Sequence, residues 1–249
     1  MAGEYITVDN VSRVFIGGES DFTAIQDISF TMEKGEFLCI VGHSGCGKST
    51  LLRIMAGIDP HHEGEVVING SVVKGPEKTR GVVFQESRLL DWMNVSKNVG
   101  FPLQDISKEE KEKLVDEYVA LVGLSDFKKA YPRELSGGMA QRVSIARALV
   151  NRPEVMFMDE PFGALDYMTK INMQNELLRI REKSRMTTIF VTHDIDEAVY
   201  LSDRIMVMSK NPGRIKEIIT NPLPFPRDRN SEEFLEIRKQ VYDCFFIDE

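Results

Sequence analysis

Residues 41–50 read VGHSGCGKST, and this stretch constrains the fold more than any other part of the sequence. From Gly42 to Ser49 it fits the pattern G-x-x-x-x-G-K-[ST], between an apolar run, FLCIV, and a helix-like run, STLLRIM. The glycines of such a loop let the backbone wrap around phosphate groups, the lysine supplies positive charge, and the hydroxyl can bind Mg²⁺. A strand, a phosphate-binding loop and a helix in this order predict an α/β domain that binds a nucleotide.

Short apolar runs alternate with helix-like segments along the remaining chain. Strands are expected at 5–15, 24–32, 36–42, 65–70, 81–85, 154–161, 187–193, 203–209 and 214–220. Helices are expected at 49–58, 108–124, 138–150, 169–185, 195–202 and 231–245. Strands that alternate with helices predict a mostly parallel sheet with helical crossovers.

The character of the sequence changes between residues 87 and 150, where helical periodicity replaces the short apolar runs. Ser107 and Glu110 have the spacing of a capping box at the start of a helix. We therefore expect one domain over residues 1–249, in which 1–86 and 151–249 form the core and 87–150 form an inserted helical subdomain.

Two proline-containing segments are expected to lie outside the regular elements. Asn211-Pro-Gly-Arg214 has Pro and Gly at the central positions of a type II turn, which would join two strands as a hairpin. The segment 221–230, NPLPFPRDRN, is broken by prolines and is expected to be exposed.

The composition limits the classes of function. The net charge of −8 argues against nucleic-acid binding, which usually needs a basic face. No apolar run of about 18 residues is present, and the N-terminus has no secretory signal pattern. The three cysteines have neither zinc-site nor disulfide spacing, so a reducing cytoplasm is the expected compartment.

Polar residues follow several of the expected strands. Asp159 and Glu160 end VMFMDE, Gln85 follows GVVF, and His193 follows TTIFVT. Ligands bind at the carboxyl ends of strands in open α/β sheets, so these residues are expected to converge on the edge that carries the phosphate loop. Alternatively, these residues could be ordinary solvated ends of strands. That four such ends are expected at one edge disfavours this alternative.

A second anion site is expected at ELSGGMAQR, residues 134–142, where Ser136-Gly137-Gly138 opens a helix and leaves bare backbone amides. Phe15 precedes Gly17-Gly18, where its ring could stack on a base, although phenylalanine is more often a core residue.

Together these motifs closely resemble the ATP-binding cassette subunits of ABC transporters over about residues 5–220. The phosphate loop corresponds to the Walker A motif, Gln85 to the Q-loop, Leu135–Arg142 to the signature, VMFMDE to Walker B, Gly163–Asp166 to the D-loop and His193 to the switch histidine. Phe15 replaces the commoner Tyr at the stacking position, and Ala140 stands where the signature often has Gln. The regulatory β-domain that sugar and sulfate importer ATPases append is not expected.

The resemblance implies an α/β P-loop fold with an N-terminal antiparallel β subdomain, and hydrolysis of ATP with Mg²⁺ by a head-to-tail homodimer. Each ATP would lie between one chain's phosphate loop and the other chain's signature. The implied catalytic residues are Lys48, Gln85, Glu160 and His193, and the implied Mg²⁺ ligands are Ser49, Gln85 and Asp159. The implied nucleotide-binding residues are Phe15, Gly42, His43, Ser44, Gly45, Cys46, Gly47, Lys48, Ser49, Thr50, Gln85, Ser136, Gly137, Gly138, Gln141, Asp159, Asp166 and His193. His43 and Cys46 would act through the backbone, with metal binding by their side chains as the disfavoured alternative.

The resemblance also implies partners. A membrane permease would dock near residues 85–95, with Trp92 and Met93 as anchors, although both could simply pack within the helical subdomain. A solute-binding protein would complete the system at the cytoplasmic face of the membrane, without nucleic acid. Residues 89–103, PFGALD, NPGRI and PLPFPRDRN resemble the nitrate, sulfonate and taurine importer branch.

Three alternatives stay open at this point. The chain could belong to an amino-acid or metal importer, since these share part of the same sequence stretches. It could be a cassette ATPase that acts on nucleic acid or the ribosome. It could also be a P-loop kinase, which would explain only the phosphate loop.

Overall fold

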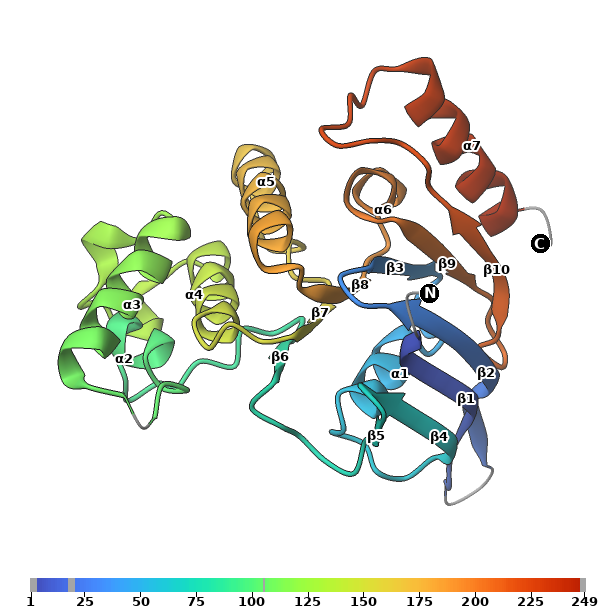
Figure 1. Ribbon diagram of the computed structural model, residues 1–249, viewed down its shortest axis with the longest axis horizontal. Helices are drawn as coiled ribbons and strands as arrows, with labels where there is room; N and C mark the ends of the chain where they lie inside the picture. Colours follow the sequence, from blue (N-terminus) through green and yellow to red (C-terminus); the bar gives the residue numbers. More distant parts are fainter. Residues whose placement is uncertain (1–3, 18–20, 105, 247–249) are drawn as a thin grey trace. The chain divides into compact units, whose positions relative to one another are not determined.

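The computed structural model describes residues 4–17, 21–104 and 106–246. The chain divides into two compact units, which are described separately: 1–77 with 187–249, and 78–186. Strands and helices alternate along the colours of Figure 1 much as the sequence predicts.

The first unit begins with an antiparallel sheet in the order β2-β1-β4-β5. These strands are β1 (Glu4–Phe15), β2 (Phe22–Glu33), β4 (Glu63–Ile68) and β5 (Ser71–Val72). In β2 buried and exposed side chains largely alternate, which places one face of the strand against the core. The expected N-terminal β subdomain is therefore present.

The first unit also contains four strands in the order β10-β9-β3-β8. They are β3 (Phe37–Gly42), β8 (Thr187–Val191), β9 (Arg204–Met208) and β10 (Ile215–Thr220). β3 is parallel to β8 and β9, whereas β10 is antiparallel to β9. Every residue of β3 and β8 is buried, as in a parallel sheet covered on both faces.

Three helices accompany these strands: α1 (Lys48–Met55), α6 (Ile195–Leu201) and α7 (Glu232–Phe246). Helix α1 packs against β3 and β8, and α7 packs against α6, β9 and β10. Figure 1 shows α6 and α7 beside the strands β9 and β10. Helices α1, α6 and α7 therefore cover the apolar side chains of these four strands.

The second unit combines a parallel strand pair with helices. The strands β6 (Arg80–Val83) and β7 (Val155–Asp159) are parallel. The helices are α2 (Val95–Val99), α3 (Lys108–Leu121), α4 (Gly137–Leu149) and α5 (Tyr167–Ser184), with short 3₁₀ turns at Ser125–Phe127 and Pro132–Glu134. The Ser107 hydroxyl accepts a hydrogen bond from the Glu110 amide at 3.1 Å, which confirms the predicted helix start.

The prediction that the segment 221–230 is exposed is wrong for two of its polar residues. Asn221 and Arg227 are 5% and 7% exposed, respectively. The Arg227 guanidinium donates to the carbonyls of Val199 and Ser202, both at 2.7 Å, at the end of α6. Carbonyls at a helix end have no partner within the helix, so these buried donors satisfy the end of α6.

The prediction of a type II turn at Asn211–Arg214 is also wrong, although the hairpin between β9 and β10 is confirmed. A type II turn needs positive φ at its third residue, but here Asn211 has φ 62 and Gly213 does not have positive φ. Gly213 is needed for a different reason: an added Cβ would lie 2.1 Å from the carbonyl oxygen of Cys46. The hairpin backbone therefore lies directly against the phosphate loop.

The fold class is confirmed as α/β with mostly parallel strands in its core, an antiparallel sheet and a helical insert. Within the described residues, no helix is both long and apolar enough to cross a membrane.

We predict that Gly213→Ala lowers the free energy of unfolding by about 1–3 kcal/mol, because the new methyl group forces the hairpin away from Cys46. Chemical denaturation measures this loss. Gly75→Ala is the matched control, since an added Cβ there has open space. Equal stability of the two variants would contradict the close contact.

Candidate functional site

The phosphate loop joins β3 to α1 through backbone conformations that favour glycine. Gly45 and Gly47 have φ 80 and 92. An added Cβ at Gly47 would lie 2.2 Å from Cγ2 of Ile25 and 2.8 Å from the Ala24 carbonyl oxygen. No acidic residue occupies the first turn of α1, so its amides and dipole offer an unopposed anion site.

Lys48 lies inside this loop, 6% exposed. Its ammonium donates to the carbonyls of Gly42 and His43, at 2.7 and 2.9 Å. Both contacts hold the positive charge beside the loop backbone, where phosphate oxygens would be bound. Ser49 and Thr50 are half-buried in the first turn of α1, and Ser44 is exposed at the tip of the loop.

The surroundings of the His43 and Cys46 side chains disfavour metal binding by either of them. Cys46 is fully buried, and burial raises the pKa of its thiol, which keeps it protonated at neutral pH rather than a thiolate ligand. The His43 ring packs against Phe245 of α7, with ring centroids 4.2 Å apart. Phe246 lies 6.0 Å from the same ring. This aromatic contact joins residues about 200 positions apart, and no sequence pattern pointed to it.

His193 follows β8 of the first unit and is exposed. The segment that contains it is fixed on both sides, because the Asp194 amide donates to the Thr192 hydroxyl at 3.0 Å and the Thr192 hydroxyl donates to Glu197 at 2.6 Å. Since β3 and β8 are adjacent and parallel, His193 and the phosphate loop leave the same carboxyl edge. The expected convergence is therefore present for these two segments.

Gln85 and Glu160 come together in the second unit, after the parallel strands β6 and β7. The Gln85 amide nitrogen lies 3.5 Å from the Glu160 carboxylate. Glu160 has φ 45, a conformation that is rare for residues other than glycine and that is often found at functional sites. Asp159 ends β7 and is 2% exposed.

Gln141 and Arg147 of α4 hold the backbone on either side of Gln85. The Gln141 amide is 2% exposed and donates to the Phe84 carbonyl at 3.0 Å. The Arg147 guanidinium donates to the carbonyls of Ser87 and Arg88, both at 2.9 Å. Gln141 thus has a structural contact within its own chain, and its direct contact with nucleotide stays a prediction.

The signature segment presents its Ser-Gly step to solvent. Ser136 caps α4 by accepting from the Met139 amide at 3.2 Å, and both Ser136 and Gly137 are exposed. An added Cβ at Gly138 would lie 2.9 Å from the Ala164 carbonyl oxygen. The signature is therefore anchored to the segment 163–166 at Gly138 and open at Gly137.

Asp166 ends that anchoring segment and caps α5, since its carboxylate accepts from the Thr169 amide at 3.1 Å. Hydrogen bonds from the Thr169 side chain and then its backbone hold the pKa of Asp166 below the usual value. The carboxylate is thus kept charged at the start of the helix.

Phe15 lies at the end of β1 and is 41% exposed. Its ring is therefore available to a ligand, as stacking on a base requires.

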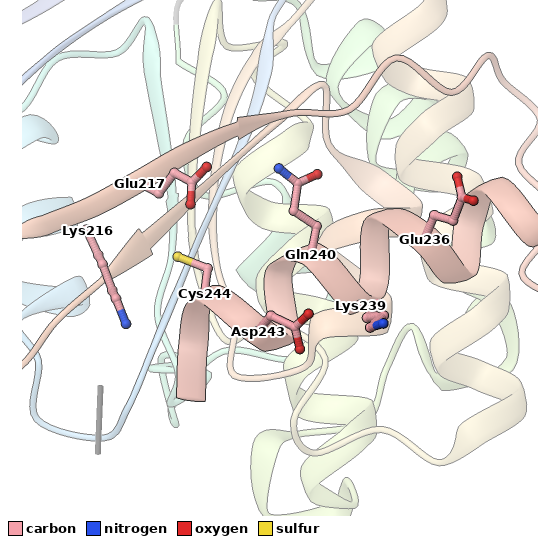
Figure 2. A pocket seen from close by; sticks show the side chains of 7 residues that line it. All are labelled: Lys216, Glu217, Glu236, Lys239, Gln240, Asp243 and Cys244. Carbon is pink, nitrogen blue, oxygen red and sulfur yellow. The ribbon is translucent and has the colours of Figure 1, made fainter. Parts of the chain in front are cut away.

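Figure 2 shows a different pocket of the first unit, about 750 Å³ in volume, between β10 and α7. Three carboxylates and two ammonium groups line it, with Gln240 and Cys244: Glu217, Glu236, Asp243, Lys216 and Lys239. The excess of negative charge disfavours a triphosphate there. Among the described residues, no group of three or more His, Cys, Asp and Glu side chains could hold a metal ion.

Comparisons with known proteins agree with this geometry. A family model described as ABC transporter matches residues 25–163, more than half of the chain. An aliphatic sulfonates import ATP-binding protein of Bacillus cereus strain ZK / E33L is 49% identical over 240 residues, which are 96% of this chain and 95% of the relative. The corresponding protein of Bacillus subtilis strain 168 is 44% identical over 96% of this chain and 94% of the relative.

A third relative, an uncharacterized ABC transporter ATP-binding protein of Methanocaldococcus jannaschii, is 50% identical over 95% of this chain and 89% of its own length. Among solved structures, a dimeric ATP-binding cassette in a post-hydrolysis state with ADP and phosphate has a TM-score of 0.82 at 31% identity. It is matched over its whole length and over 88% of this chain. These likenesses confirm the resemblance inferred from the motifs, and the chain belongs to the ATP-binding cassette family of ABC transporters.

Proposed function

We propose that this protein binds and hydrolyses ATP to energise the import of a small solute by an ABC transporter. The observation that carries the proposal is the pairing of Gln85 with a strained Glu160 at the end of a buried strand. The phosphate loop and His193 follow two adjacent parallel strands at the same edge of the sheet, and they add the groups that a triphosphate needs. Known relatives of this length and similarity are named for the same role.

ATP binding is assigned to the phosphate loop and Phe15. The backbone amides at the start of α1 bind the phosphates, and Lys48 neutralises the outer two. The Phe15 ring stacks on the adenine, since its exposed face is apolar and flat.

Magnesium is assigned to Ser49, Asp159 and Gln85, whose oxygen atoms suit a hard cation. Mg²⁺ is usually held by one or two carboxylates together with substrate phosphates, so a single buried carboxylate such as Asp159 fits this demand. When bound, the ion would neutralise charge on the β- and γ-phosphates.

Hydrolysis is assigned to Glu160, which orients an attacking water and accepts its proton. Gln85 lies against the Glu160 carboxylate and would help to place that water. His193 would donate a hydrogen bond to the γ-phosphate, and Lys48 would stabilise the charge that develops on it.

The exposed signature segment is proposed to complete the ATP site of a second copy. Ser136 and Gly137 are exposed at a helix start, where the hydroxyl hydrogen of Ser136, whose oxygen accepts from the Met139 amide, and the amide of Gly137 can donate to a phosphate. The dimeric form of similar cassettes supports a homodimer that closes around two nucleotides.

A groove of the second unit is proposed as the docking site for the permease. It has a volume of about 410 Å³ and is lined by both apolar and basic side chains. The apolar ones include Phe84, Leu90, Phe101 and Pro102, and the basic ones are Lys78, Arg80 and Arg147. Such a surface fits a short amphipathic helix that carries acidic groups. Phe101, 51% exposed, is the better anchor, since Trp92 is exposed but does not line the groove.

The groove is connected to the catalytic segment. Arg147 lines the groove and also holds the carbonyls of Ser87 and Arg88, and the Arg88 guanidinium stacks on the Phe84 ring at 4.1 Å. A helix that binds in the groove would therefore contact the side chain that holds residues 87 and 88, just after Gln85.

The solute is proposed to be an alkyl sulfonate or a similar small oxyanion, because relatives at 44–49% identity are named for sulfonate import. A solute-binding protein would complete the system, with this subunit at the cytoplasmic face of the membrane. Import of another small solute is the second candidate, since specificity resides in the partners rather than in the cassette.

We predict that Glu160→Gln lowers the rate of ATP hydrolysis at least about 100-fold, because the amide cannot accept the proton of the attacking water. Binding of ADP should stay close to that of the unaltered chain. Phosphate release and calorimetric titration measure the two quantities. Hydrolysis at the normal rate would refute the role of Glu160.

We predict that Phe101→Glu lowers solute-stimulated ATP hydrolysis of the assembled transporter several-fold, because it places a charge among the apolar side chains that line the groove. The isolated subunit should keep its basal activity. Phe127→Glu is the matched control, since Phe127 is also exposed but lies outside the groove. Equal stimulation in both variants would exclude the groove as the docking site.

A further inference from the structure

Arg13 stacks on the ring that is proposed to bind adenine. Its guanidinium carbon lies 4.2 Å from the centroid of the Phe15 ring. Two hydrogen bonds fix its orientation: Nε donates to the Asp59 carboxylate at 3.0 Å, and Nη1 donates to the Val14 carbonyl at 2.8 Å. The side chains of Arg13 and Asp59 are only 16% and 18% exposed, so this is not a freely solvated surface pair.

Asp59 is itself held by the end of α1. Its amide donates to the Arg53 carbonyl at 3.2 Å, just beyond the last turn of that helix. Its second carboxylate oxygen accepts from the His61 amide at 3.0 Å. Since α1 begins at Lys48, the same helix carries the phosphate loop at one end and the support of Arg13 near the other.

The surroundings leave part of the Phe15 ring for a ligand. Phe22 pairs with Phe15 across β1 and β2, and residues directly opposite in a sheet place their side chains on the same side. Phe15 remains 41% exposed and Phe22 53% exposed, although Arg13 covers one face of the Phe15 ring. The result is an apolar, flat surface beside a fixed cation.

We infer that Arg13, held by Asp59, is a positioning residue that fixes Phe15 for stacking on the nucleotide base. This inference rests on the proposed role of Phe15 in base binding. A ring that is fixed before the ligand arrives loses less conformational freedom on binding, and this strengthens the complex. A cation over one face also draws π-electron density toward it, which favours an electron-rich purine on the opposite face.

Arg13 is expected to affect binding of the base and not binding of the phosphates. Stacking acts on the face of a base, so the contribution of Arg13 applies to a purine nucleotide. It does not apply to a phosphate ligand without a base, because such a ligand contacts only the loop and α1. A general distortion of the site would weaken both ligands together.

The test is calorimetric titration of the full chain with ADP and with pyrophosphate. We expect Arg13→Ala to weaken ADP binding roughly three- to tenfold and to leave pyrophosphate binding unchanged. Arg13→Lys should also weaken ADP binding, since an ammonium lacks the planar face, and Asp59→Asn should give a smaller loss of the same kind. Arg53→Ala, which removes an exposed arginine of α1, is the matched control and should change neither ligand.

If Phe15→Ala weakens ADP binding, two outcomes would overturn the role of Arg13 and leave the proposed base site intact. Unchanged ADP binding by Arg13→Ala would show that Arg13 does not position the ring. Equal loss of ADP and pyrophosphate would show that the substitution disturbs the whole site. Full ADP affinity of Phe15→Ala would instead refute the proposed base site, and the role of Arg13 would fall with it.

Discussion

The phosphate loop depends on glycine at position 47, where its backbone packs directly against β2. Gly47 has φ 92, and an added Cβ there would be 2.2 Å from Ile25. The hairpin after β9 approaches the loop just as closely, because Gly213 lies against the Cys46 carbonyl. This close contact fixes the start of α1 and the carbonyls that hold Lys48. The anion site, the position of Lys48 and the support of Phe15 near the far end of α1 all depend on it.

A second constraint is the direction of the strands. In each unit a parallel pair brings two functional segments to one carboxyl edge: the phosphate loop and His193 follow β3 and β8, and Gln85 and Glu160 follow β6 and β7. Parallel neighbours make this convergence unavoidable, since their carboxyl ends lie at the same edge. The polar residues can therefore be far apart in sequence while each pair is close in space.

The sequence was sufficient for features that depend on local patterns. The phosphate loop, the apolar strands and the helix starts at Ser107 and Ser136 follow from residue type and spacing, and the structure has them all. Helix α2 was missed because its five residues are too short for a periodic pattern.

Features that depend on distant partners could not be predicted in this way. Arg227 looks like a solvated residue of a proline-rich tail, yet it is buried against the end of α6. The type II turn was expected from Pro and Gly alone. Glycine is needed at position 213 because the backbone there contacts Cys46. The contacts of His43 with Phe245, and of Arg13 with Asp59, join segments that no short motif contains.

The central claim is that the exposed signature of one copy completes the ATP site of another. Mixing Ser136→Arg chains with Glu160→Gln chains tests it most directly, because a mixed dimer would contain one site with an intact Glu160 and an intact opposing Ser136. Each variant alone should be nearly inactive in ATP hydrolysis, and the mixture should recover up to about a quarter of normal activity, since random pairing makes about half of the dimers mixed. Full hydrolysis by Ser136→Arg alone would contradict the shared site.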